Sequence, residues 1–174
     1  ITRFTFWEAR DTQDISSGIE LGKTAFALRV VRPYYSDAKL IGYVELGEEI
    51  EHFMEILKSE TSNEFGIIAD KTHLDRENWK SVRKTAGRAD NWDDLQKHVI
   101  LATTSDDPAA RGCFTEESLE KVEEGEAMLQ RIDSGDQNFV CSGFEILDAG
   151  GRHAGAVLTL VDITNIVTMA TKSN

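Results

Sequence analysis

Two tryptophans and three basic residues lie close together near the middle of the chain, and as a group they have the chemistry of a small-molecule site. Trp79 and Trp92 flank Arg83, Lys84 and Arg88. An aromatic wall beside a guanidinium suits a ligand that carries a carboxylate. The alternative is structural: Trp79 anchors the hydrophobic core, and the basic side chains cover a solvated helix surface. Both interpretations stay open, and we take Trp79, Arg83, Arg88 and Trp92 as candidate ligand-binding residues.

Arg29 is a fifth candidate and lies in a segment rich in β-formers. Arg29 and Arg32 are three positions apart, so they face opposite sides of a strand and at most one can point into a pocket. Arg29 stands between Leu28 and Val30, which makes it the better candidate. The alternative is a charge on an edge strand that faces water.

Sequence motifs of common enzymes are missing from the chain. It has no GxSxG, no P-loop and no glycine-rich phosphate fingerprint. Asp and Glu number 31, so pairs of carboxylates are too frequent to indicate acid–base catalysis. The four histidines are scattered without HExxH spacing, which argues against a zinc site. We therefore assign no catalytic residue, no metal site and no cofactor.

Cys113 and Cys141 are the two cysteines of the chain. They are not in CxxC spacing, which argues against a metal or redox motif. A disulfide is the alternative in an oxidising compartment, but we expect two free, partly buried thiols.

Composition and charge limit the classes of partner. The 174 residues suit one domain or two small ones, with 40% hydrophobic and 29% charged residues. A net charge of −12 argues against binding to nucleic acid or to anionic lipid. No apolar run reaches the roughly 18 residues of a membrane span, and no signal peptide is visible. Because the chain starts at Ile1, we expect a piece of a longer protein.

The first part of the chain predicts a short helix, three strands and a second helix. The helix covers residues 4–10, and the strands cover 17–21, 26–34 and 40–46. From Glu48 the period changes, because Ile50, Phe53, Met54 and Leu57 fall on one face of a helix.

The second part predicts strand, helix, strand, helix, hairpin and exit helix. We expect strands at 65–69 and 98–104, a helix capped by Asp75, and one charged helix over 114–132. A hairpin pairs 137–147 with 153–161, and Asp162 caps the last helix. Antiparallel strands with helices on one face give an α+β fold.

The two parts align at an offset of 113 residues, which places Gly42 on Gly155. The further matches are Phe26 with Phe139, Lys39 with Arg152, Val44 with Val157, Glu49 with Asp162, and Ile50 with Ile163. Chance is one explanation, since any hairpin followed by a helix gives some matches. The other is a duplication, with modules at 1–62 and 63–174. The first module then shows only its back half, the hairpin and exit helix.

The junction Asp162-Ile163-Thr164, where a strand runs into a helix, resembles the closing segment of PAS-like modules. The stretches SSGIELG, FALRVVRPYY, LIGYVELGEEIEH and LDRENW…GRADNWDDL are similar to the double-Cache sensor regions of bacterial transmembrane receptors, which include sensor histidine kinases, chemoreceptors and cyclic-dinucleotide enzymes. The resemblance implies a PAS-like antiparallel sheet flanked by helices, a membrane-anchored parent protein and a periplasmic location. The truncated first module departs from the family and puts any ligand site there in doubt.

Three functional hypotheses follow. The first is an extracytoplasmic sensor that binds a small molecule and passes a conformational change through the helix after Asp162. The second is a cytoplasmic PAS-type dimerisation module without a ligand, and the third and least favoured is an enzyme. The stripe formed by Ile50, Phe53, Met54 and Leu57 allows a weak homodimer, or else packs against its own sheet.

Overall fold

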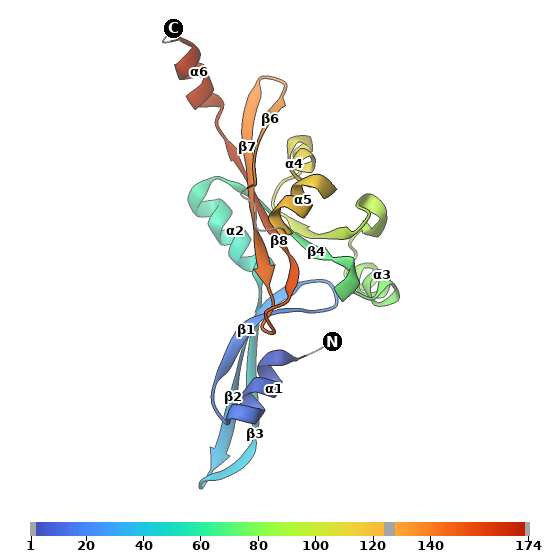
Figure 1. Cartoon of the computed structure of the whole chain (residues 1–174), viewed down its shortest axis with the longest axis vertical. Helices are drawn as coiled ribbons and strands as arrows, with labels where there is room; N and C mark the ends of the chain where they lie inside the picture. Colours follow the sequence, from blue (N-terminus) through green and yellow to red (C-terminus); the bar gives the residue numbers. More distant parts are fainter. Residues whose placement is uncertain (1–2, 124–127, 173–174) are drawn as a thin grey trace.

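The computed structural model describes residues 3–123 and 128–172 as an α+β protein with two antiparallel sheets, which confirms the expected fold class (Figure 1). The first part consists of α1 (Phe4–Thr12), β1 (Ser16–Leu21), β2 (Phe26–Ser36), β3 (Lys39–Glu49) and α2 (Ile50–Thr61). The second part begins with β4 (Glu64–Asp70), the 3-10 turn η1 (Lys71–His73), α3 (Arg76–Thr85), the 3-10 turn η2 (Trp92–Asp94) and β5 (His98–Thr103). It ends with α4 (Pro108–Cys113), α5 (Glu116–Glu123), β6 (Met128–Ser134), β7 (Gln137–Leu147), β8 (His153–Asp162) and α6 (Thr164–Lys172).

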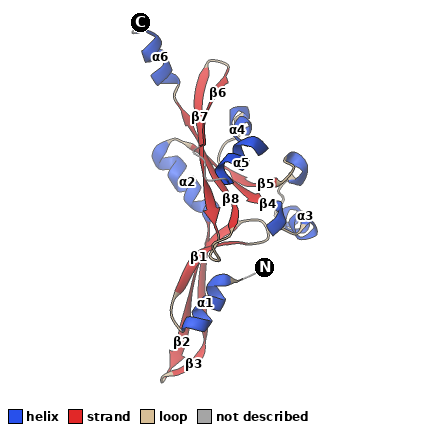
Figure 2. Cartoon of the chain, in the orientation of Figure 1, coloured by secondary structure: helices blue, strands red, loops and turns tan. Residues whose placement is uncertain are grey.

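The first sheet has the strand order β1-β2-β3, and α1 lies along it (Figure 2). Thr5 and Ala9 of α1 are buried, and the backbone and hydroxyl of Thr5 both donate to the buried carboxylate of Glu20 at 2.8 Å. Val30 and Leu46 lie opposite each other on β2 and β3, and both are exposed. One face of this sheet therefore exposes apolar side chains within the described chain.

The second sheet has the strand order β5-β4-β8-β7-β6, with β8 at its centre. Two hydrophobic cores form around it, because successive residues of β4 face opposite sides. One core contains Ile68 and the side chains of α4 and α5. The other contains Ile67 with Met54 of α2, Trp79 of α3 and Phe26 of β2. The second core joins the two parts of the chain.

The helix predicted over 114–132 is confirmed over α5 and is wrong from Met128 onward. The helix α5 ends at Glu123, and β6 begins at Met128 and pairs with β7 along its length. Met128 is buried while Leu129 is exposed, which is the alternation of a strand. Pairing with β7 therefore overrides the helical spacing of the apolar residues in this stretch.

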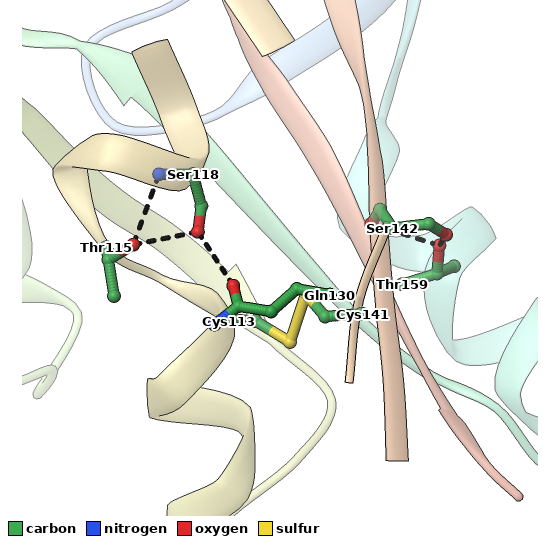
Figure 3. The surroundings of a disulfide bond; sticks show 7 residues. All are labelled: Cys113, Thr115, Ser118, Gln130, Cys141, Ser142 and Thr159. Atoms are coloured by element: carbon green, nitrogen blue, oxygen red, sulfur yellow. Dashed lines mark hydrogen bonds between the residues drawn. A yellow bond between two sulfur atoms is a disulfide. The ribbon is translucent and has the colours of Figure 1, made fainter. Parts of the chain in front are cut away.

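The expectation of free thiols is also wrong, because Cys113 and Cys141 form a disulfide (Figure 3). Cys113 ends α4, Cys141 lies in β7, and their Cα atoms are 5.8 Å apart. Both cysteines are buried in the first core. Beside the disulfide the Ser118 hydroxyl donates to the side-chain oxygen of Gln130 at 3.1 Å, which ties α5 to β6. The pairing depends on α4 lying directly on β7, a contact that residue spacing does not reveal.

Reduction of the disulfide is expected to lower the free energy of unfolding by about 3–4 kcal/mol, the loop-closure value for a sequence separation of 28 residues. Urea unfolding with and without reductant measures the difference. The double variant Cys113→Ala/Cys141→Ala is the control and should be insensitive to reductant. Equal midpoints for the oxidised and reduced wild-type protein would contradict the bond.

The order of elements repeats at the offset of 113 residues. The segment α1-β1-β2-β3-α2 has the same order as α5-β6-β7-β8-α6. Moved by 113 positions, β3 falls on 152–162, where β8 lies, and β1 falls on 129–134, where β6 lies. The strands β4 and β5 have no counterpart beside β3 in the described chain. The division into modules at residue 62 stays a prediction.

Two glycines that match at this offset have very different surroundings. A Cβ atom on Gly155 would lie 2.0 Å from the carbonyl oxygen of Ile68, because β8 packs closely on β4. A Cβ atom on Gly42 would meet no atom within 4 Å. The two sites differ because β8 has a neighbouring strand on each side, whereas β3 is an edge strand of its sheet.

Gly155→Ala is expected to cost at least about 2 kcal/mol of stability, since backbone atoms of β4 cannot move away cheaply. Gly42→Ala is the matched control and should be neutral or stabilising by about 0.5–1 kcal/mol, because alanine restricts the unfolded chain. Chemical unfolding of both variants checks the contrast. Similar effects of the two substitutions would count against the observed sheet order.

Candidate functional site

A cleft of about 500 Å³ lies between α2, β5 and the loop that joins α3 to β5. Its lining residues combine charged, amide and apolar groups: Glu51, His52, Met54, Glu55, Arg83, Arg88, Asn91, Ile100, Leu101, Ala102 and Thr103. The volume falls within the range of small-molecule sites. Two of the five candidate ligand-binding residues, Arg83 and Arg88, thus line one cleft.

Trp79 lies behind this cleft in the second core. Its side chain is fully buried, and its ring centroid is 5.8 Å from that of Trp92. The Arg83 guanidinium lies 5.0 Å from the centre of the Trp79 ring, within reach of a cation–π interaction. Trp79 therefore anchors the core behind a cleft residue and is not among the residues that line the cleft.

Arg83 holds the loop between α3 and β5. It is only 9% exposed, and its Nε and Nη1 atoms donate to the carbonyl oxygens of Ala89 and Leu101 at 3.0 and 3.1 Å. Burial, with the positive charge of Arg88 nearby, lowers the pKa of Arg83. Its Nη2 atom has no hydrogen bond within the described residues. The buried guanidinium is therefore fixed in place with one donor group left over.

Arg88 forms a two-pronged ion pair with Glu51 of α2. The Nη2 atom lies 2.9 Å from Oε1 and the Nη1 atom 3.2 Å from Oε2. These hydrogen bonds lower the pKa of Glu51 and raise that of Arg88, so both groups are charged at neutral pH. Glu51 is mostly shielded from solvent and Arg88 is about half exposed. The pair joins the first turn of α2 to the loop across the cleft.

Trp92 is partly buried and is not among the lining residues of the cleft. The Lys71 ammonium and the Arg76 guanidinium lie 5.3 and 5.4 Å from the centre of its ring, and Arg76 pairs with Asp90 at 2.8 Å. The contact between Trp92 and Trp79 places Trp92 behind the site, as a support for the loop.

The structure does not bring Arg29 to the cleft. Its Nη1 atom donates to Glu45 at 2.6 Å, and its Nε atom is 3.4 Å from Glu20, which also lies 3.6 Å from Arg3. Its strand β2 belongs to the other sheet, so Arg29 takes part in an ion-pair cluster under α1. Arg29 is therefore not part of this cleft, and its role as a ligand contact stays a prediction.

Sequence reasoning missed the partners that approach from distant segments. Asn91 donates to the carbonyl oxygen of Ile100 at 2.8 Å, and its buried Oδ1 atom has no hydrogen bond within the described chain. Glu51 and Glu55 are one helical turn apart on α2, and both line the cleft. The only available signal was the polar face of an amphipathic helix, which does not identify its neighbour.

One group of acidic and histidine side chains has metal-ligand spacing. Single ligand atoms of Glu49, Glu51 and His52 lie within 4.8 Å of one another at the start of α2. Glu51 already pairs with Arg88, and helix N-termini disfavour cations. We therefore do not assign a metal site to this group.

On the opposite face of the sheet, the space between β4, β8 and α4 is filled by side chains. The pocket between β4, β8 and α4 holds only about 10 Å³. Phe114 fills this space, since a Cβ atom on Gly66 would lie 2.3 Å from its ring. Beside β4, room for a ligand therefore lies on the side of α2 and α3.

The junction of β8 and α6 has the hydrogen bond expected from the sequence. The amide of Thr164 donates to the Asp162 carboxylate at 2.8 Å, and hydrogen bonds from Thr164 lower the pKa of Asp162 below its ordinary value of 3.8. The amide of Ile163 donates to the Asn138 carbonyl at 2.8 Å, and the amide of Asn138 donates to the Thr164 hydroxyl at 2.8 Å. The start of α6 is thus fixed to β7 and β8.

Asp162→Ala is expected to cost about 1 kcal/mol at neutral pH, the usual loss for a helix cap. Asp162→Asn keeps an acceptor and should cost less. Because the folded pKa is lowered, the charged carboxylate contributes above about pH 4 and loses its contribution as pH falls through the folded value. Thermal unfolding between pH 3 and 7 measures this, and a loss in Asp162→Ala that does not shrink towards pH 3 would contradict it.

The family model described as the double sensory domain of two-component sensor kinase matches residues 8–167. A search of curated proteins finds no match. Among the described residues, no helix is long and apolar enough to cross a membrane.

Proposed function

Because the chain belongs to the family of double sensory domains of two-component sensor kinases, we propose that it binds a small carboxylate-bearing molecule in the cleft between α2 and β5. The observation that carries this proposal is the cleft itself. It has the volume of a ligand site and two guanidinium groups in its wall. In this proposal the region has no catalytic role, and the kinase activity belongs to another part of the receptor.

The chemistry of the wall supports an anionic group attached to a small body. Arg83 is held by two carbonyls and keeps the Nη2 atom for a further acceptor. The apolar side chains of Met54 and Leu101 line the same space. Glu55 adds a negative charge that would suit an amine on the same ligand, so amino acids are within the expected class.

The position of the cleft supports a relay to the exit helix. Met54 fixes α2 in the second core, and Lys58 of α2 forms an ion pair with Glu64 of β4 at 3.0 Å. From β4 the sheet continues to β8, which leads into α6 at the far end of the molecule (Figure 1). A ligand that moves α2 or β5 would therefore act on a sheet whose central strand carries the output helix.

The disulfide supports an extracytoplasmic location of this region. Disulfides persist in oxidising compartments such as the bacterial periplasm and are rare in the cytosol. Cys113 and Cys141 are bonded in the core of the second sheet. This bond favours the periplasmic sensor over the cytoplasmic dimerisation module. The parent protein in this proposal is anchored in the inner membrane.

A weak homodimer remains part of the proposal. In the stripe on α2, Met54 is buried against the sheet and Ile50 is half-buried, whereas Phe53 and Leu57 are exposed. Intramolecular packing thus uses part of the stripe, and the rest offers a small apolar contact for a second copy.

A thermal-shift screen against small carboxylates, amino acids and amines tests the function. A binder at 100 times its dissociation constant should stabilise the wild-type protein by about 2.7 kcal/mol. Arg88→Met should reduce this stabilisation. Arg32→Met is the matched control with the same charge change on the first sheet, and should retain it. A panel without any stabilising compound, or a full shift in Arg88→Met, would reject the cleft as the site.

A further inference from the structure

The ion pair of Glu51 with Arg88 has the geometry that a ligand carboxylate would use. Both oxygens of Glu51 accept from the two terminal nitrogens of one guanidinium, at 2.9 and 3.2 Å. This fork arrangement is the preferred way for arginine to bind a carboxylate. Glu51 and Arg88 are 37 residues apart in sequence and both line the cleft. The terminal edge of the Arg88 guanidinium is therefore already filled by a carboxylate of the chain.

We propose that Glu51 is an internal substitute for the ligand, and that a carboxylate ligand displaces it from Arg88 and releases the first turn of α2. This inference rests on the proposed function, because it concerns the same cleft. The exchange replaces one carboxylate by another on the same guanidinium. The ratio of the two bound states is therefore set by the difference between the affinities of Arg88 for the ligand carboxylate and for Glu51. A small difference allows the ligand to switch one state to the other.

The fixed points of α2 determine which part of the helix moves. Lys58 lies near the C-terminal end of α2, where it pairs with Glu64 and donates to the carbonyl oxygen of Thr104. Met54 is buried in the middle of the helix. At the N-terminal end, Arg88 holds Glu51 across the cleft, and Ile50 next to it is only half-buried. Displacement of Glu51 therefore removes the side-chain contact between the first turn of α2 and the α3–β5 loop, while the backbone of this turn still continues from the paired strand β3.

The ion pair is strong enough to hold the helix turn and weak enough to be exchanged. Arg88 is 46% exposed, so solvent screens the pair. Pairs of this kind shift an equilibrium by about fivefold or less. A ligand that gains further contacts with Arg83 or Asn91 would exceed this factor.

The test compares acetate binding to the wild-type protein, Glu51→Gln and Glu55→Gln. Backbone amide signals of α2 and of the α3–β5 loop are followed by NMR during titration with sodium acetate, and acetamide serves as the uncharged control probe. Both substitutions remove one negative charge from the cleft, but only Glu51→Gln removes the competing carboxylate. We expect acetate to bind Glu51→Gln about two- to fivefold more tightly than Glu55→Gln.

In the wild-type protein, acetate should also shift the amide signals of the first turn of α2. Equal affinities of the two variants for acetate would mean that only the loss of one negative charge matters, and this result would overturn the displacement. Weaker binding by Glu51→Gln would make Glu51 a ligand contact and also overturn it. If acetate binds neither variant, displacement by a carboxylate is rejected, while a thermal shift by an amine or neutral compound would leave the sensor function standing. If no compound binds, both proposals fail.

Discussion

The close packing of β8 between β4 and β7 is the constraint on which the rest of the structure depends. The carbonyl of Ile68 lies so near Gly155 that no side chain fits between them. This contact places β8 at the centre of the five-stranded sheet, where it contributes to both hydrophobic cores. Each core holds a different set of helices. Packing against β8 and its neighbouring strands therefore sets the positions of α2, α3, α4 and α5. The direction in which the chain leaves the sheet is set by the same strand.

The sequence predicted most elements with a strong local pattern. The alternation and turn residues of 26–46 and 137–161 predicted both hairpins, and the apolar spacing from Ile50 to Leu57 predicted α2. It did not predict β6, because the apolar residues of α5 and β6 together imitate a continuing helix period. The pairing that decides the matter is made with β7, and such non-local contacts leave little trace in a short window.

The sequence brought together only those residues of the candidate site that are close in the chain. Trp79, Arg83 and Arg88 are on one helix and the loop that follows it, so local spacing brought them together. Glu51 joins them from a helix that is distant in sequence, and only the folded chain places it there. The sequence could not show that Arg29 lies away from this cleft, because the facing of a residue in its own strand does not say which sheet that strand joins. The sequence left the disulfide as the less favoured alternative, because the pairing of Cys113 with Cys141 depends on the layer that α4 forms on β7.

The absence of a linker between β3 and α2 has a consequence for recombination between sensors. The strand ends at Glu49 and the helix begins at Ile50, so the phase of the helix is fixed by the last residue of the strand. One inserted residue would turn the helix by about 100° and carry Met54 out of the core. Length differences between related sensors should therefore collect at tips such as Asp37-Ala38. A chimera that exchanges the first sheet must be joined in phase, and loop length offers no freedom to correct it.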